Sequence, residues 1–275
     1  MHGAFQHPLR VGVRLLWMFA ELLYIGSLYP SMVLLCAGET RLIRRARWLQ
    51  YGSRRLLRIF GGRLAHTGQL PGSGLLVCNH LSYLDVLALS AISPCAFVAK
   101  QEVRSWPVFG WFARLGGTLF TDRQRRMEVG LLTRDLKSLL DQNLLVVLFP
   151  EGTSSDGRTV LPFKSALLQP AVDSRHPVSA AAIAYGLEDG DAGEEVCYWK
   201  DMTFVPHLLN LLAKKRITIS LRFARFSKSS ASRKELARHL HAEVSMLRSH
   251  SAVRVETTCP GVAAETAFST MEPVA

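Results

Sequence analysis

The sequence predicts an α/β protein with a mixed, largely parallel sheet flanked by helices, preceded by an N-terminal membrane-associated helical segment. Three observations predict this fold class. Short apolar runs recur after residue 62 without the alternation of a half-exposed strand, which favours a sheet covered on both faces. A segment with helical periodicity separates two of these runs, as in a parallel crossover. A long apolar stretch and an arginine-rich segment precede all of them.

The N-terminal segment contains the longest apolar stretch. Residues 15–37 form 23 positions with Glu21 as the only charged residue. A bilayer span takes about 20 residues, so the stretch is long enough. Glu21 and Pro30 make a straight span costly, and a helical hairpin in one leaflet or a shallow amphipathic helix are the alternatives. We expect a spanning or deeply inserted helix, and the run is too long for a cleaved signal peptide.

The next segment combines positive charge with aliphatic side chains. Arginines interleave with apolar residues over 41–59, which is typical of a basic amphipathic helix on anionic lipid headgroups; they are Arg41, Arg44, Arg45, Arg47, Arg54, Arg55 and Arg58. Residues 1–60 hold nine arginines against two glutamates, hence +7 of a net charge of +11. The positive-inside rule predicts the inner, cytoplasmic membrane, with the following domain facing the cytoplasm. The aliphatic interleaving makes a nucleic-acid partner a distant second.

The remaining elements follow from periodicity and end signals. The predicted strands are 75–78, 96–99, 144–149, 179–185 and 217–223. Residues 127–140 have the spacing of a crossover helix, and 208–213 favour a short helix. Ser232 and Glu235 form a capping box that opens a last helix. We expect membrane-anchoring helices over 1–60, one folded domain over 61–250 and a disordered tail over 251–275.

A histidine and a carboxylate follow the first of these strands. Residues 79–85 read Asn-His-Leu-Ser-Tyr-Leu-Asp. His80 and Asp85 are the pairing that a general base needs when an alcohol attacks an activated ester. Five positions leave them on different faces of a straight helix, so the pair must form across a turn before a helix that begins near Ser82. Alternatively, Asp85 is a structural residue in the cap of that helix.

A second block, Phe-Pro-Glu-Gly-Thr at 149–153, comes directly after another predicted strand. With further blocks it resembles the glycerolipid acyltransferases typified by 1-acylglycerol-3-phosphate O-acyltransferase. The matching blocks occur in the expected order, and they are 79–85, 99–111 with 117–123, 149–164, and 177–184. Together they cover residues 79 to about 185, and the ordered series is far more specific than the histidine–aspartate pair alone.

The resemblance implies a glycerol-3-phosphate acyltransferase-like fold and a membrane-bound O-acyltransferase of lipid biosynthesis. The expected reaction moves a fatty acyl group from acyl-CoA or acyl carrier protein to the hydroxyl of a lysophospholipid. No metal and no bound cofactor are required. His80 would deprotonate the hydroxyl, and Asp85 would orient His80 and stabilise its charged form.

Further residues are assigned to substrate binding by the same resemblance. Arg123, Glu151 and Gly152 would contact the acceptor head group and the developing oxyanion, with backbone N–H groups near Gly152 as oxyanion donors. Arg123 suits bidentate phosphate recognition, although it lies in a charge run that also fits a solvated face. The other predicted substrate-binding residues are Lys100, Thr153, Arg158 and Lys164.

One departure from the family pattern concerns the acceptor. Where members acting on lysophosphatidate commonly carry an arginine directly after Glu-Gly-Thr, this chain has Ser154. The acceptor of first choice is 1-acyl-sn-glycerol-3-phosphate, which would give phosphatidic acid, with Arg158, Lys164 or Lys100 as replacement contacts. The alternatives are another lysolipid such as lyso-ornithine lipid, or a non-catalytic lysolipid-binding protein.

The five cysteines carry no paired metal spacing, which favours reduced thiols in a cytosol-facing protein. Cys78 stands two residues before His80, and this position raises the possibility of a cysteine nucleophile. Because Cys78 belongs to an apolar strand, we expect it to be buried and inert.

Overall fold

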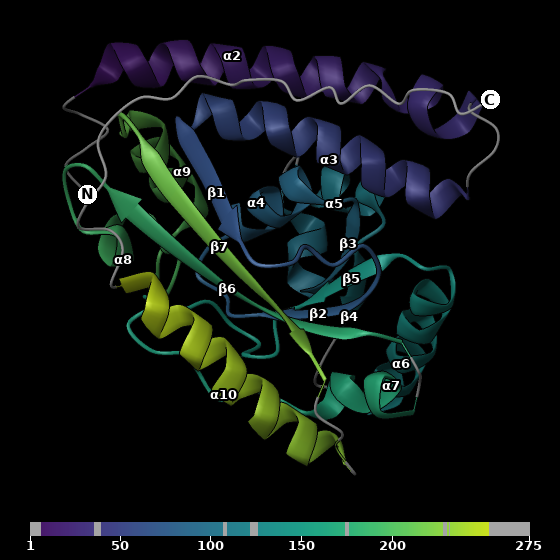
Figure 1. The fold of residues 1–275 in the computed structure, drawn as a ribbon. Coiled ribbons are helices and arrows are strands. Elements are labelled where there is room, and N and C mark those ends of the chain that lie inside the picture. The colour runs from purple at the N-terminus through teal and green to yellow at the C-terminus, as the bar shows by residue number, and fades with distance from the viewer. Residues whose placement is uncertain are drawn as a thin grey trace, which may run out of the picture.

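The structure, a computed structural model, describes residues 7–35, 40–106, 109–121, 126–173, 176–227, 230 and 232–252. Seven strands form one sheet in the order β1–β7–β6–β2–β5–β3–β4 (Figure 1). The strands are β1 (Gly62–Thr67), β2 (Gly74–Cys78), β3 (Cys95–Lys100), β4 (Leu119–Thr121), β5 (Leu145–Leu148), β6 (Val178–Leu187) and β7 (Ile217–Phe226). Only β6 and β7 pair antiparallel, so the predicted mixed, largely parallel sheet is confirmed.

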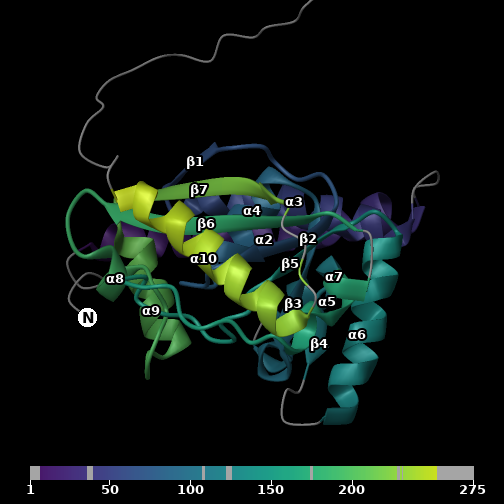
Figure 2. The same ribbon diagram turned by 60° about the horizontal axis from the view of Figure 1, so that its bottom comes forward.

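Helices cover both faces of this sheet (Figures 1 and 2). The α-helices are α2 (Pro8–Ser27), α3 (Arg41–Ile59), α4 (Leu84–Ile92), α5 (Phe109–Gly116), α6 (Arg126–Asp141), α7 (Gln169–Asp173), α8 (Ala192–Glu195), α9 (Phe204–Ala213) and α10 (Arg233–Ala252). A π-helical turn covers Pro30–Leu35, and 3₁₀ turns cover Gln101–Ser105 and Ala166–Leu168. The N-terminal apolar helix, the crossover helix α6 and the capping of α10 by the Ser232 hydroxyl agree with the sequence.

The strand period of two divides the core into two clusters, one on each face of the sheet. On β2, Leu76 and Cys78 join a cluster with residues of α3, α4 and α9. Leu75 and Val77 join the opposite cluster, which contains residues of α6 and α10. Because β2 is buried at every position, its sequence reads as a continuous apolar run, as expected for a strand covered on both sides.

The five predicted strands are confirmed, and two strands were missed. β1 lies at one edge of the sheet, and four of its six residues are exposed, so it carries no apolar run. β4 lies at the other edge and has three residues. Edge strands bury less side-chain surface than central ones, and hydrophobic patterning therefore detects them poorly.

Helix α3 was predicted from its basic amphipathic pattern, but its apolar side faces the protein. Trp48, Leu56 and Ile59 are buried in the same cluster as the strands β2, β3 and β7. Arg54 donates to the carbonyl oxygen of Ala91 at the end of α4, at 2.7 Å. Residues before and after position 60 thus share one hydrophobic core, and α3 is a wall of the folded domain.

Helix α2 lies lengthwise beside α3 and α9 (Figure 1). Glu21 is only 7% exposed and forms an ion pair with Arg55 of α3, with its two oxygens 2.5 and 2.8 Å from the guanidinium nitrogens. Arg14 donates to carbonyl oxygens at the end of α9, including Leu212 at 3.1 Å. The carboxylate that made a bilayer span costly is therefore neutralised inside the protein.

Residues 8–35 are long and apolar enough to cross a membrane by length and composition. The apolar side of α2 that faces away from the domain is open; its exposed residues are Leu9, Val13, Leu16, Phe19 and Leu23. These positions recur every three or four residues, so they form a single stripe along the helix.

Candidate active site

The candidate site forms where two neighbouring parallel strands end. Strands β2 and β5 pair in register from Gly74 with Leu145 to Val77 with Leu148. The residues that follow each strand, His80 and Glu151, therefore come out at the same edge of the sheet. The carboxyl ends of parallel strands are where open α/β sheets place their ligands.

His80 and Asp85 are in direct contact. Asp85 Oδ2 lies 2.7 Å from His80 Nδ1, and the Asp85 side chain is completely buried, whereas 23% of the His80 side chain is exposed. The imidazole stacks on the ring of Phe149, with ring centroids 4.2 Å apart. An ionised carboxylate accepts from Nδ1–H, so Nε2 of the neutral ring is left as the proton acceptor.

Asp85, in the first turn of helix α4, also bonds the loop that precedes the helix. Its Oδ2 accepts the backbone N–H groups of Leu81 at 2.7 Å and Ser82 at 3.1 Å. Oδ1 accepts the hydroxyl of Tyr185 at 2.5 Å. Asp85 therefore has a structural role beside its contact with His80, but this role is to hold the loop before α4, since the N-cap residue Tyr83 has no side-chain cap bond.

The loop that carries His80 is bonded on several sides. The backbone N–H of His80 donates to Glu151 Oε1 at 3.1 Å. The Asn79 side chain pairs with the backbone of Ile183 on β6, donating to its carbonyl oxygen at 3.1 Å and accepting its N–H at 2.8 Å. The His80 carbonyl accepts the N–H of Ser155 at 3.0 Å. Such bonding holds the imidazole in place before any substrate arrives.

Glu151 faces the interior. It is 3% exposed, and burial raises its pKa to about 8, against the lowering effect of the N–H groups of His80 and Leu161. Its second oxygen, Oε2, is buried without a hydrogen-bond partner among the described residues. At neutral pH this carboxyl group is protonated, so it supports the His80 loop as an uncharged group.

The loop after Glu151 brings backbone groups to the site. Gly152 has a φ of +77°, a conformation that glycine adopts without steric cost. Its N–H donates to the carbonyl oxygen of Phe149 at 3.2 Å and is therefore already engaged. The next residue, Thr153, is exposed and lines the same pocket as His80.

A pocket of about 270 Å³ opens beside His80. The predicted residues Lys100, Gly152 and Thr153 line it with His80. Its wall also contains residues that the sequence motifs did not single out, Tyr198, Trp199 and Lys200, from the segment after α8. Lys200 has a φ of +53°, and its ammonium lies 3.6 Å from the centroid of the Trp199 ring. Only the fold brings this segment to the site. Lys100 and Lys200 give the rim of the pocket positive charge.

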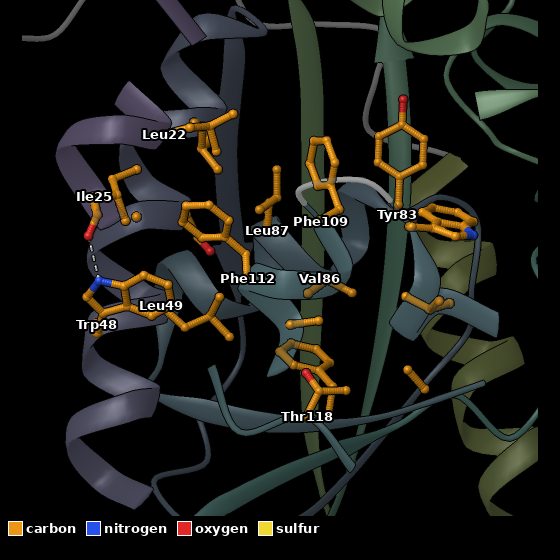
Figure 3. Close-up of a pocket in the computed structure, with 18 residues that line it drawn as sticks. Leu22, Ile25, Trp48, Leu49, Tyr83, Val86, Leu87, Phe109, Phe112 and Thr118 are labelled. Atoms are coloured by element: carbon orange, nitrogen blue, oxygen red, sulfur yellow. Dashed lines mark hydrogen bonds between the residues drawn. The ribbon is translucent and has the colours of Figure 1, made fainter. Parts of the chain in front are cut away.

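An apolar cavity of about 110 Å³ adjoins this pocket (Figure 3). It lies between α2, α3, α4 and α5 and shares residues such as Val86 and Phe97 with the His80 pocket. Trp48 and Ile25 lie at one end, where the indole N–H donates to the Ile25 carbonyl at 2.8 Å, and Tyr83 lies at the other (Figure 3). A narrow apolar space of this kind suits a hydrocarbon chain.

Tyr83 is a wall of both cavities. Its hydroxyl lies 3.0 Å from Nδ1 of the buried His207, whose Nε2 lies 3.2 Å from the Cys197 carbonyl. Burial lowers the pKa of His207 to about 4, so the ring is neutral. With Nε2–H donated to the carbonyl, Nδ1 accepts the Tyr83 hydroxyl proton, and this bond fixes the ring at the junction.

Arg158 and Lys164 are not brought to the pocket. Arg158 has a 75% exposed side chain and pairs with Asp156 at 3.4 Å. Lys164 is exposed, and its backbone N–H donates to the Pro150 carbonyl at 2.8 Å. Arg123 lies outside the described residues. The predicted burial of Cys78 is observed, and desolvation raises its pKa well above the usual range, which disfavours a thiolate nucleophile.

The comparisons with known proteins define the class first. The family model described as Acyltransferase matches residues 64–184, which contain all the predicted sequence blocks. The crystal structure of the 1-acyl-sn-glycerophosphate acyltransferase from Thermotoga maritima has the same fold, with a TM-score of 0.63 and 20% sequence identity, covering 90% of this chain and 100% of that one. The class is that of the acyltransferases.

Curated relatives narrow the class to a family. A lyso-ornithine lipid O-acyltransferase from Brucella abortus is 38% identical over 206 residues, which are 69% of this chain and 77% of the relative. A 1-acyl-sn-glycerol-3-phosphate acyltransferase from Neisseria gonorrhoeae is 35% identical over 162 residues, 56% of this chain and 60% of that protein. The chain belongs to the glycerolipid acyltransferase family and is an O-acyltransferase of the 1-acylglycerol-3-phosphate O-acyltransferase type.

Proposed function

We propose that this protein transfers a fatty acyl group from an acyl thioester, acyl-CoA or acyl carrier protein, to the free hydroxyl of a lysolipid at a membrane surface. The observation that carries the proposal is the His80–Asp85 pair at 2.7 Å, with His80 in the wall of a pocket that adjoins an apolar cavity. A base beside a space for a hydrocarbon chain is what this transfer needs.

In the proposed reaction, His80 Nε2 takes the proton of the lysolipid hydroxyl. The hydroxyl oxygen attacks the thioester carbonyl, and a C–O bond forms. When the tetrahedral intermediate collapses, the C–S bond breaks and the imidazolium returns the proton to the sulfur. Asp85 holds the ring and balances its positive charge during the step. General base assistance by His80 contributes about two to four powers of ten in rate.

The developing oxyanion needs hydrogen-bond donors within about 3 Å. The Gly152 N–H is bonded to Phe149, so the N–H of Thr153 at the pocket wall is the better candidate. Lys100 and Lys200 at the rim supply positive charge for a phosphate of the acceptor or of the donor. Glu151 acts from the interior by holding the backbone of His80.

For the acceptor, lyso-ornithine lipid is now the first choice and 1-acyl-sn-glycerol-3-phosphate the second. Ser154 replaces the arginine expected for a phosphate acceptor, and its hydroxyl donates to the Tyr198 carbonyl. Arg158 pairs with Asp156 away from the pocket and does not compensate for the missing arginine. Among the relatives, the lyso-ornithine lipid enzyme from Brucella abortus matches over a larger share of its length than the glycerophosphate enzyme from Neisseria gonorrhoeae.

We propose that α2 anchors the protein as a helix that lies in the plane of the membrane interface. The apolar stripe of α2 faces outward, while its other side is bonded to α3 and α9 through Glu21 and Arg14. This arrangement favours a helix that lies in the membrane interface over one that crosses the bilayer alone. The inner membrane and a cytoplasm-facing domain remain the proposed location, on the charge of residues 1–60.

The test is acyl transfer by the purified chain in mixed micelles. Acyl-CoA and acyl carrier protein thioesters are offered with lyso-ornithine lipid, 1-acyl-sn-glycerol-3-phosphate or lysophosphatidylcholine. We expect transfer to lyso-ornithine lipid and a loss of about two to four powers of ten in His80→Ala. His176, which pairs with Asp141 at 2.8 Å on the surface, provides a matched control in His176→Ala. Unchanged turnover in His80→Ala would refute the catalytic assignment, and no transfer at all would favour a lysolipid-binding protein.

A further inference from the structure

The carboxylate of Asp85 has a partner on β6 at the end of the last sequence block, which the motifs did not assign to the site. Tyr185 donates its hydroxyl to Asp85 Oδ1 at 2.5 Å. The other oxygen, Oδ2, is shared by His80, Leu81 and Ser82. Among the described residues, Tyr185 is thus the only group bonded to Oδ1, whereas the imidazole bonds Oδ2.

The sheet topology places Tyr185 there. Strand β2 ends at Cys78, which pairs with Ala181 of β6. Strand β6 continues to Leu187, so its last residues extend past the end of β2 along the loop that carries His80. The side chain of Asn79 fixes this overlap through both backbone groups of Ile183. Two positions further along the same strand side, Tyr185 reaches the Asp85 carboxylate.

Tyr185 can only donate in this bond. Burial raises the pKa of the Tyr185 hydroxyl well above its usual range, and the charge of Asp85 raises it further. The phenol therefore keeps its proton throughout the working pH range. Because Asp85 is completely buried, its charge depends on such donors, and an unpaired oxygen of a buried carboxylate would be costly.

We propose that Tyr185 is a positioning residue of the acyl transfer proposed above, which holds the second oxygen of Asp85 and draws off part of its negative charge. In this arrangement Asp85 keeps the His80 ring in place without binding the imidazolium too tightly. The hydroxyl does not touch substrate, and it acts only through Asp85.

The titratable groups around Asp85 come from several elements. They are His80, Tyr185, Glu151 after β5, Cys78 on β2 and Cys197 after α8. Burial raises the pKa of Glu151 to about 8 and that of Cys197 to about 12. It also raises the pKa of the Cys78 thiol. Near neutral pH these three are uncharged, so the acid side of an activity profile reports the His80–Asp85 pair.

The experiment compares Tyr185→Phe with the unaltered chain in kcat/KM across pH 5 to 9. The variant keeps the ring and loses one hydroxyl. We expect kcat to fall roughly tenfold, the size of one hydrogen bond to a charged group. We also expect the acid limb of the profile to move to higher pH, because the carboxylate then holds more charge and favours the protonated imidazole. Tyr51→Phe, on α3 beside Tyr24 and Arg55 and outside both cavities, is the matched control and should leave both unchanged.

A structural role alone would give a different pattern. If Tyr185→Phe lowers kcat but leaves the acid limb in place, or changes neither, the proposal is wrong. Titration of the His80 ring by NMR, assigned by comparison with His80→Gln, provides a readout without turnover. If the His80 ring titrates at a different pH in Tyr185→Phe, the positioning role is supported even when no lysolipid is acylated. An unaltered chain without activity refutes only the proposed function.

Discussion

At the residue scale, two buried carboxyl groups hold the same short loop with different sets of hydrogen-bond donors. Asp85 is surrounded by donors, among them two backbone N–H groups and the Tyr185 hydroxyl. Glu151 has fewer donors and a buried oxygen without a partner among the described residues. With so few donors, burial is the largest effect on Glu151 and raises its pKa, because a buried carboxylate is stable only when hydrogen bonds replace water.

The raised pKa of Glu151 predicts how stability depends on pH. Between the ordinary glutamate pKa of 4.5 and about 8, the unfolded chain has released this proton while the folded chain retains it. The free energy of unfolding therefore falls as pH rises through this window. Glu151→Gln should match the unaltered chain near pH 5 and be more stable at pH 9, by an amount on the order of a few kcal/mol at most.

Urea unfolding at pH 5 and pH 9 measures this difference. Glu194→Gln, at a side chain that is 52% exposed, is the control and should change neither value. The idea fails if Glu151→Gln loses stability equally at both pH values, since the glutamate would then be ionised in the folded protein.

At the element scale, the apolar cavity is made by four helices that the sequence places in two separate regions. Leu22 and Ile25 come from α2, and Phe112 and Ala113 come from α5. Because the bottom of the cavity is helix surface, a larger side chain on a helix should shorten it. In the proposed reaction, the packing of these helices would set the length of the acyl chain.

Ala113 offers a test of this dependence. Ala113→Phe adds a ring to the wall of a cavity of about 110 Å³. Each buried methylene contributes about 0.8 kcal/mol, so losing room for two should lower kcat/KM for a long-chain donor relative to a shorter one by roughly tenfold.

Competition between C12 and C16 acyl-CoA measures the preference. Ala113→Ser nearly conserves volume and serves as the control. An unchanged preference in Ala113→Phe would mean that the acyl chain of the donor lies elsewhere.

At the scale of the whole molecule, the outer stripe of α2 lies on the same face of the sheet as the apolar cavity. The stripe, rather than the whole N-terminal segment, is the right part to alter. Deleting residues 1–60 would also remove core side chains such as Trp48 and Ile59.

We expect the double substitution Leu16→Glu with Phe19→Glu to release the protein from vesicles that contain anionic lipid. Both side chains are exposed, at 74% and 64%, so the fold should tolerate the change. Two charges in place of apolar side chains that would insert into the membrane reduce the partition of the protein onto vesicles by at least roughly a hundredfold. Sedimentation with vesicles measures the release.

Met246→Glu changes an exposed apolar residue on α10, on the opposite face of the sheet, and should leave sedimentation unaltered. If the α2 variant still sediments fully, the main membrane contact lies elsewhere on the molecule.

The sequence by itself determined the central strands, the helices α4, α6, α9 and α10, and the His80–Asp85 pair. These features depend on local patterns, namely apolar runs and a short motif whose members are five residues apart. It also placed Glu151 and Gly152 at a strand end. Local patterns could not show that Glu151 points inward, because its contact with the backbone of His80 depends on a loop from elsewhere in the chain. They also did not show that the Gly152 N–H is engaged within its own turn, by the carbonyl oxygen of Phe149.

Only the tertiary structure decided which residues meet at the site. Tyr185 and Lys200 reach it from β6 and from the segment after α8, about a hundred residues or more after His80, whereas Arg158 and Lys164, which are nearer in sequence, do not. The tertiary structure also decided what covers α3, because its basic amphipathic pattern fits a membrane surface and a protein core equally well. The periodicity of a helix shows that one side is apolar, and only packing shows what covers that side.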